Sequence, residues 1–74
     1  MQRIKVLFDD IQSVKGFYEV ASCTPCDLDI GRGITFYDAK SILGLLNLRF
    51  GEAQYLNIYS EEDYSERFRR WTIQ

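Results

Sequence analysis

The sequence predicts an α/β fold (α+β) in which a four-stranded antiparallel sheet carries three helices on one face. Three observations lead to this prediction. The 74 residues suffice for one domain, 46% of them are hydrophobic, and segments that alternate between apolar and polar residues are interleaved with segments of helical periodicity. The expected order is β-α-β-β-α-β-α in a single domain, residues 1–74, with the second face of the sheet open to water.

The first strand and helix follow from hydrophobic periodicity. Residues 3–8 alternate between apolar and polar side chains, which predicts a half-buried strand. Residues 12–22 place apolar side chains at helical spacing, which predicts an amphipathic helix. Asp9 or Asp10 would cap this helix, and Pro25 would end it.

A β-hairpin is predicted next. Residues 27–30 and 34–37 form two short alternating runs around Gly31-Arg32-Gly33, which we interpret as a three-residue turn. Polar residues on these runs and on the other strands would occupy the open face, and the expected set is Arg3, Lys5, Asp27, Asp29, Thr35 and Asn57.

The remaining elements are a short helix, a strand and a last helix. Asp38 or Ser41 would cap an apolar helix at residues 42–48. Gln54–Tyr59 alternates and would complete the sheet. A last helix would begin at Ser60, with its apolar face formed by Tyr64, Phe68 and Trp71.

Composition excludes several function classes. Nine Lys and Arg against eleven Asp and Glu argue against a dedicated nucleic-acid binder. No apolar run is long enough to span a membrane and no signal peptide is visible, so the expected location is the cytoplasm, where cysteines stay reduced. The absence of His removes Ser/His and Cys/His nucleophile pairs and most zinc sites. We therefore expect no enzyme, no cofactor and no metal site.

The run Lys40-Ser41-Ile42-Leu43-Gly44, followed by further apolar residues, resembles the second helix of the histidine-containing phosphocarrier (HPr) family of the sugar phosphotransferase system. The family's segment reads close to LKSIMG, and an ungapped register extends from about Asp10 to Ile58. The resemblance implies an HPr-like open-faced β-sandwich, with a C-terminal helix shorter than is usual in the family. It also implies a bacterial protein concerned with carbon-source regulation.

The sequence departs from the family at the active site. In this register the phosphoacceptor His falls on Asp10, its partner Arg falls on Gln12, and the Pro that follows is replaced by Ser13. Phosphorelay through a His is therefore impossible. The chain resembles histidine-less members of the family, in which the fold persists without the carrier chemistry.

Ser41 is the first candidate site. The resemblance implies phosphorylation by a dedicated serine kinase, after which phosphoserine promotes docking to a transcription regulator of carbon catabolism. A phosphate at a helix N-terminus would meet free backbone N–H groups and the positive end of the helix dipole. The alternative is that Ser41 only caps the helix.

A docking surface on the same helix is the second candidate. The resemblance implies that Leu43 and Leu46 are exposed partner-binding residues, with Lys40 and Ile42 completing the set. The five apolar residues of so short a helix cannot all face the core, which favours this prediction. The alternative is that all five belong to the core.

Two further motifs have structural alternatives. Asp10 could imitate the charge of a phosphorylated His or, less readily, accept phosphate itself, but helix capping explains it as well. Cys23-Thr24-Pro25-Cys26 is a C-x-x-C motif that follows a helix, so the dipole would not lower the thiol pKa. Two thiols in a turn are the simpler interpretation, although two chains could share a Cys₄ zinc site.

Three function classes follow. The leading one is an HPr-like regulatory protein that binds protein partners, a serine kinase and a transcription regulator among them, with Ser41 as its switch. The alternative is a plain interaction or self-association module without a phosphotransferase link, as a monomer or weak dimer. The third is a thiol redox enzyme using Cys23 and Cys26.

Overall fold

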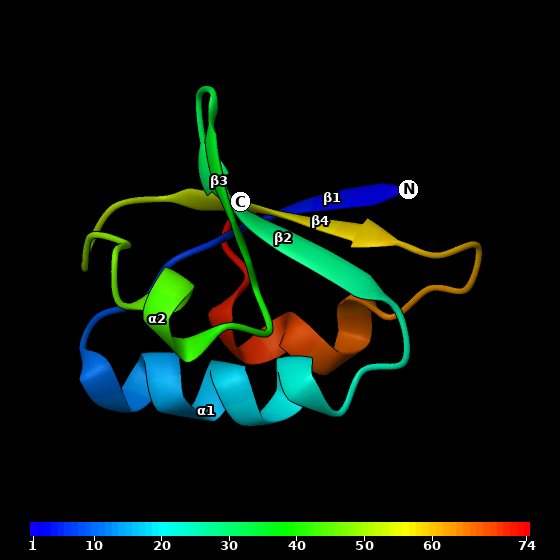
Figure 1. Ribbon diagram of the computed structural model, residues 1–74, viewed down its shortest axis with the longest axis horizontal. Helices are drawn as coiled ribbons and strands as arrows, with labels where there is room; N and C mark the ends of the chain where they lie inside the picture. The colour runs from blue at the N-terminus through cyan, green and yellow to red at the C-terminus, as the bar shows by residue number, and fades with distance from the viewer.

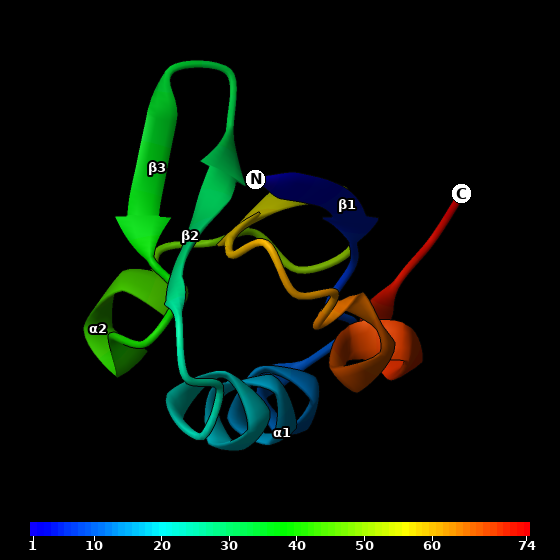
Figure 2. The same ribbon diagram turned by 90° about the vertical axis from the view of Figure 1, so that its right-hand side faces the viewer.

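The computed structural model describes residues 1–74 and confirms the predicted fold class (Figure 1). One face of a four-stranded antiparallel sheet is covered by helices, and the other carries none (Figures 1 and 2). The elements in chain order are β1 (Gln2–Val6), α1 (Ile11–Ser22), β2 (Asp27–Arg32), β3 (Thr35–Asp38), α2 (Ile42–Leu45), β4 (Gln54–Tyr59) and the 3-10 helix η1 (Ser65–Trp71). None of the helices has the length and apolar character that crossing a membrane requires.

The strands lie in the order β1-β4-β2-β3, and every neighbouring pair is antiparallel. The outer edge of β1 is partly covered by the C-terminal tail. Leu7 donates its backbone N–H to the carbonyl of Trp71 (2.9 Å), and Ile73 donates to the carbonyl of Lys5 (2.8 Å). The other edge strand, β3, pairs only with β2.

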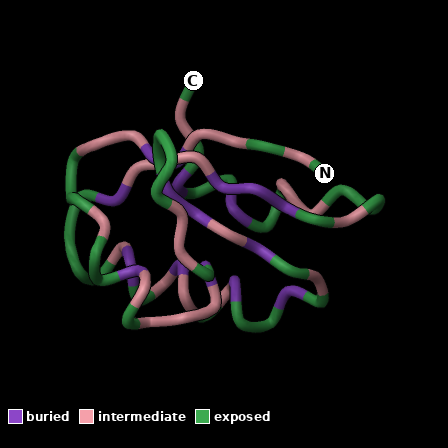
Figure 3. The backbone as a smooth tube through the Cα atoms, turned by 45° about the horizontal axis from the view of Figure 1, so that its top comes forward, coloured by how far each residue is buried: buried purple, intermediate pink, exposed green.

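The core lies between the sheet and the helices, and buried positions recur along the central strands (Figure 3). Phe17 of α1 stands at its centre. Its ring contacts those of Phe8, Phe68 and Trp71 at centroid distances of 5.0, 5.2 and 5.5 Å. Phe17 is fully buried, so one side chain joins the segment after β1, helix α1 and helix η1.

The β2–β3 hairpin turns over two residues rather than the predicted three. Arg32 pairs with Thr35, so Gly33 and Ile34 form the loop. Gly33 has φ +62° and precedes a residue with negative φ, as the first central position of a type II′ turn requires. The one-residue difference reverses the face of β3, so Phe36 takes the place predicted for Thr35 on the open face.

Gly31, assigned to the turn from the sequence, lies instead within β2. A Cβ there would stand 2.0 Å from the carbonyl oxygen of Thr35 and 2.8 Å from the Cα of Phe36. The close approach of β3 therefore requires glycine at this position.

Helix α2 is shorter than predicted and ends at Leu45. Beyond it the chain tightens, because Asn47 and Leu48 donate their N–H groups to carbonyls three residues earlier, those of Gly44 and Leu45. The side-chain amide of Asn47 also donates to the carbonyl of Leu43 (2.9 Å), which satisfies a helix-end acceptor.

The last helix begins at Ser65 rather than Ser60 and is a 3-10 helix. Two local turns precede it: the Ser60 hydroxyl accepts from the N–H of Glu62, and the Asp63 carboxylate accepts from the N–H of Ser65. With three residues per turn, Phe68 and Trp71 lie on the same side and both are buried.

We predict that Gly31→Ala destabilises the protein by about 1–3 kcal/mol, because the added methyl group must push β3 away from β2. Urea unfolding would measure the loss, with the exposed Thr35→Ala variant as a control on the neighbouring strand. A Gly31→Ala variant as stable as the parent would contradict the close strand approach.

Candidate functional site

Three segments meet at one end of the molecule: the start of α1, helix α2 and the loop of residues 46–53 (Figure 1). A backbone hydrogen bond from the Gly51 N–H to the Phe8 carbonyl (2.8 Å) ties the loop to the segment that leads into α1. Gly51 has φ +77°, a backbone conformation that favours glycine. The predicted candidates Asp10, Ser41, Leu43 and Leu46 all belong to these segments.

Helix α2 buries one leucine and exposes its neighbours, as predicted. Leu45 is fully buried and Ile42 packs against the core, whereas Leu43 is 74% exposed and Leu46 is 51% exposed. One helical turn cannot direct all its apolar side chains inward, and the exposed ones lie on the outer side. Neither leucine is required by the core.

Two exposed apolar residues were missed at this end. Phe50, in the loop after α2, is 49% exposed, and Ile11, the first residue of α1, is also exposed. The sequence could have indicated an exposed Phe50, because this large aromatic residue directly precedes the turn glycine Gly51. We refer to Ile11, Leu43, Leu46 and Phe50 as the α2-end surface. Four exposed apolar residues on neighbouring segments make this end of the molecule a candidate protein interaction site.

Ser41 is the N-cap of α2. Its hydroxyl oxygen accepts a hydrogen bond from the Gly44 N–H (3.2 Å), and its side chain is half-buried beside the α2-end surface. Because α2 is a single turn, its dipole is weak, and the N–H groups of Ile42 and Leu43 are the main local donors for an anion.

Lys40, predicted to bind a partner, has a structural contact in this fold. Its ammonium donates to the carbonyl of Thr24 (2.6 Å), while its backbone N–H donates to the Asp38 carboxylate (2.9 Å). The side chain therefore links the loop before α2 to the loop after α1. Its ammonium group makes this hydrogen bond within the chain.

Asp10 is the N-cap of α1, and its carboxylate accepts from the Ser13 N–H (2.9 Å). Gln12 is exposed on the first turn. No three His, Cys, Asp or Glu side chains gather into a group that could hold a metal ion. Asp10 thus has the capping role, and the carboxylates that an acyl-phosphate site would need are not assembled around it.

The two cysteines are free thiols in the connection between α1 and β2. Cys23 is the C-cap of α1 and is exposed, whereas Cys26 is half-buried against the core. Arg67 of η1 donates to the carbonyl of Cys23 (3.3 Å). The motif stands at the C-terminus of α1 rather than at a helix N-terminus, where reactive C-x-x-C motifs are found.

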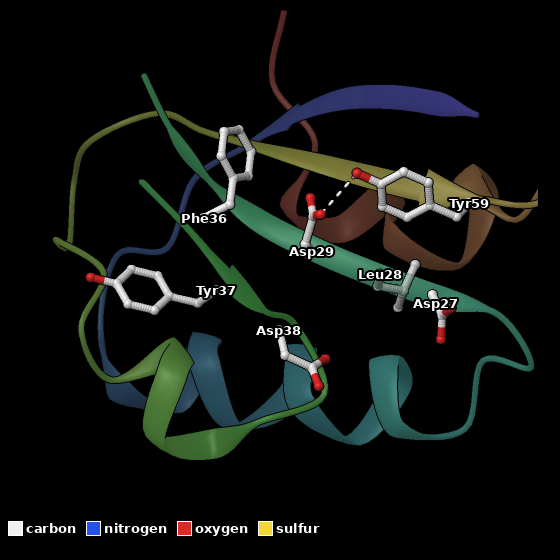
Figure 4. A pocket seen from close by; sticks show the side chains of 7 residues that line it. All are labelled: Asp27, Leu28, Asp29, Phe36, Tyr37, Asp38 and Tyr59. Atoms are coloured by element: carbon white, nitrogen blue, oxygen red, sulfur yellow. Dashed lines mark hydrogen bonds between the residues drawn. The ribbon is translucent and has the colours of Figure 1, made fainter. Parts of the chain in front are cut away.

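The sheet face opposite the helices carries a hydrogen-bonded network. We define the open face as the odd-numbered residues of β1, β2 and β4 and the even-numbered residues of β3. Arg3 donates through Nε to Asn57 (2.7 Å), and Asn57 donates to Asp29 (2.7 Å). Tyr59 donates its hydroxyl to the second oxygen of Asp29 (2.8 Å; Figure 4). This hydrogen bond raises the pKa of Tyr59 above its usual value.

The comparisons with known proteins bear on the fold alone. The structure is similar to the crystal structure of HPr-C-His from Thermoanaerobacter tengcongensis, with a TM-score of 0.72 and 17% sequence identity over 92% of this chain and 83% of that one. No protein-family model and no curated protein gives a significant match to the sequence. The chain therefore has an HPr-like fold, as predicted from the resemblance.

Two leucines of α2 provide a matched test of the α2-end surface. We predict that Leu45→Ala costs about 2–5 kcal/mol of stability because Leu45 is fully buried. Leu43→Ala should change stability by less than about 0.5 kcal/mol because its side chain is exposed. Urea unfolding of both variants checks this. A loss of more than about 2 kcal/mol in Leu43→Ala would place Leu43 in the core.

The Tyr59–Asp29 hydrogen bond predicts a pH dependence. Because folding raises the Tyr59 pKa, the bond's stabilisation is complete below the ordinary tyrosine pKa of about 10 and is lost as the pH rises through the higher folded-state value. The stability difference between the parent and Tyr59→Phe should therefore shrink in alkaline solution. Tyr37→Phe, which removes a hydroxyl without a hydrogen bond, is the control. A difference that stays constant across this pH range would contradict the prediction.

Proposed function

We propose that this chain is an HPr-like regulatory protein that acts by binding another protein through the α2-end surface, with Ser41 as a phosphorylation switch. The observation that carries the proposal is the exposure of Leu43 and Leu46 beside Ser41 on an HPr-like fold. The fold has no need of these two side chains in its core, so a partner is the simplest reason for their exposure.

The amino-acid composition supports docking rather than phosphate relay. The 74 residues contain no His, and Asp10, at the position where the resemblance places the phosphoacceptor, caps α1. In this proposal the protein does not catalyse a reaction. Its Asp10 carboxylate adds a permanent negative charge next to the α2-end surface, where a phosphorylated His would carry one.

Phosphorylation would change the α2-end surface through charge. A phosphate on Ser41 adds about −1.5 to −2 charge at neutral pH. Next to Leu43 it would turn an apolar surface into one that combines apolar side chains with a strong hydrogen-bond acceptor. A partner with an arginine facing this position would then be preferred over one with an entirely apolar site.

The partner classes follow from the resemblance. We propose a serine kinase that modifies Ser41 and a transcription regulator of carbon-source use that binds the modified form, both in a bacterial cytoplasm. The departures at Asp10, Gln12 and Ser13 favour the second candidate, an interaction module on the same fold without any phosphotransferase link. Phosphorylation of Ser41 distinguishes the two.

The test is the intact mass of the protein before and after incubation with ATP and a serine kinase that modifies HPr proteins. We expect a gain of one phosphate group that is absent in Ser41→Ala. Leu43→Ser, which keeps the hydroxyl of Ser41, shows whether the kinase also docks on the α2-end surface. No gain, or a gain that persists in Ser41→Ala, would leave the interaction module as the function.

A further inference from the structure

The open face is a second ordered surface, and its charges are divided between its two sides. The cationic side chains, Arg3 and Lys5, come from β1 at one edge of the sheet. The carboxylates, Asp27 and Asp29 of β2 and Asp38 of β3, come from the other half of the sheet. The face is therefore dipolar across the strands rather than uniformly polar.

Internal contacts hold the Arg3 guanidinium above the middle of the sheet. Its Nε bonds to Asn57 of β4, which is almost fully buried, and its central carbon lies 5.4 Å from the Tyr55 ring and 5.7 Å from the Phe36 ring. Phe36 and Tyr55 both lie beside Gly31 in the strand register, so the guanidinium lies near both rings on this face. The terminal N–H groups of Arg3 make no hydrogen bond within the chain, so they remain available to an acceptor outside it.

The strand order makes this face complementary to itself. The strands lie in the order β1-β4-β2-β3, so the midline of the sheet runs between β4 and β2. The Arg3 guanidinium is held above β4, and Asp29 belongs to β2. A two-fold axis parallel to the strands at this midline places β4 of one copy over β2 of the other. The guanidinium of each copy then faces Asp29 of the other. Lys5 lies at the level of Phe36 of the other copy, two residues along β3 from Asp38. An axis across the strands would instead place like charges together.

We propose that the open face is the contact surface of a symmetric dimer, in which a second copy of this chain covers it sheet to sheet. Two sheets packed in this way would form a sandwich with their strands about 30° apart. The tight β2–β3 turn supports the proposal, because the hairpin rises on this side of the sheet and ends in Ile34, which is 101% exposed (Figure 2). An apolar side chain at the tip of such an arm can contact the second copy.

The size of the molecule sets the strength expected of this dimer. Its extents are 29 × 24 × 24 Å, so even a whole face falls short of the roughly 800 Å² per partner that specific interfaces typically bury. The dimer should therefore be weak and form in a concentration-dependent manner. This inference goes beyond the proposed function, since the open face and the α2-end surface lie on different parts of the molecule.

The test is sedimentation equilibrium over a wide range of protein concentration, using two charge reversals. Lys5→Glu and Asp38→Lys should each weaken self-association about tenfold or more, because in each homodimer the reversed charge of one copy lies near like charges on the other copy. An equimolar mixture of the two variants should recover the parent's association, since the reversed charge of each variant then lies near opposite charges on its partner. Higher salt should weaken the parent's dimer.

Asp38→Lys also removes the carboxylate that accepts from the Lys40 N–H, so circular dichroism and urea unfolding must show that both variants fold. Recovery in the mixture excludes misfolding as the cause of the loss. A parent that stays monomeric at all concentrations overturns the proposal, and so does a mixture that does not recover. Dissociation by Leu43→Ser but not by Lys5→Glu would likewise overturn it, because self-association would then use the α2-end surface.

Discussion

The fold depends on one buried aromatic cluster, in which Phe17 packs against Phe8, Phe68 and Trp71. These four rings come from three separate segments, and a domain of this size has a thin core in which such large side chains dominate burial. Once α1 lies against the sheet through Phe17, the connections on both sides are constrained. One side of the sheet is then fully covered, and the other is left for polar and aromatic side chains.

Hydrophobic periodicity was sufficient for the element order and for most of the core, because each strand and each long helix has one buried face. It was insufficient where local geometry decides between neighbouring alternatives. Two glycines, Gly31 and Gly33, stand close together where β2 ends, and only the close approach of β3 to Gly31 distinguishes the strand glycine from the turn glycine. For the same reason the side of the sheet that Phe36 faces could not be predicted. The chain forms two local turns at Ser60 and Asp63 before η1 begins at Ser65, and periodicity does not predict these turns.

The candidate site was predictable in part. Five apolar residues in one short segment implied that some must be exposed, and Leu43 and Leu46 are the ones. Ile11 and Phe50 could not be added from the sequence, because the backbone bond from Gly51 to Phe8, which holds the loop of Phe50 against the segment that leads to Ile11, joins residues far apart in the chain. The structural hydrogen bond of Lys40 could not be predicted either, since its acceptor, the Thr24 carbonyl, lies sixteen residues earlier in the chain. Charge balance in the sequence likewise concealed the division of charge across the open face, which arises only from the strand order.

The pairing of the first strand has a consequence for synthesis on the ribosome. β1 has no partner near it in the sequence: it pairs with β4, where Gln2 lies opposite Ile58, and its outer edge meets the backbone of residues 71–73. Phe17 likewise reaches its full packing only when Phe68 and Trp71 are present. The N-terminal half therefore cannot reach its native packing while the later segments are still inside the exit tunnel. The sheet and the aromatic core should form only after residues 54–73 have left the tunnel, whereas the β2–β3 hairpin is the one part of the sheet that can form earlier from local contacts alone.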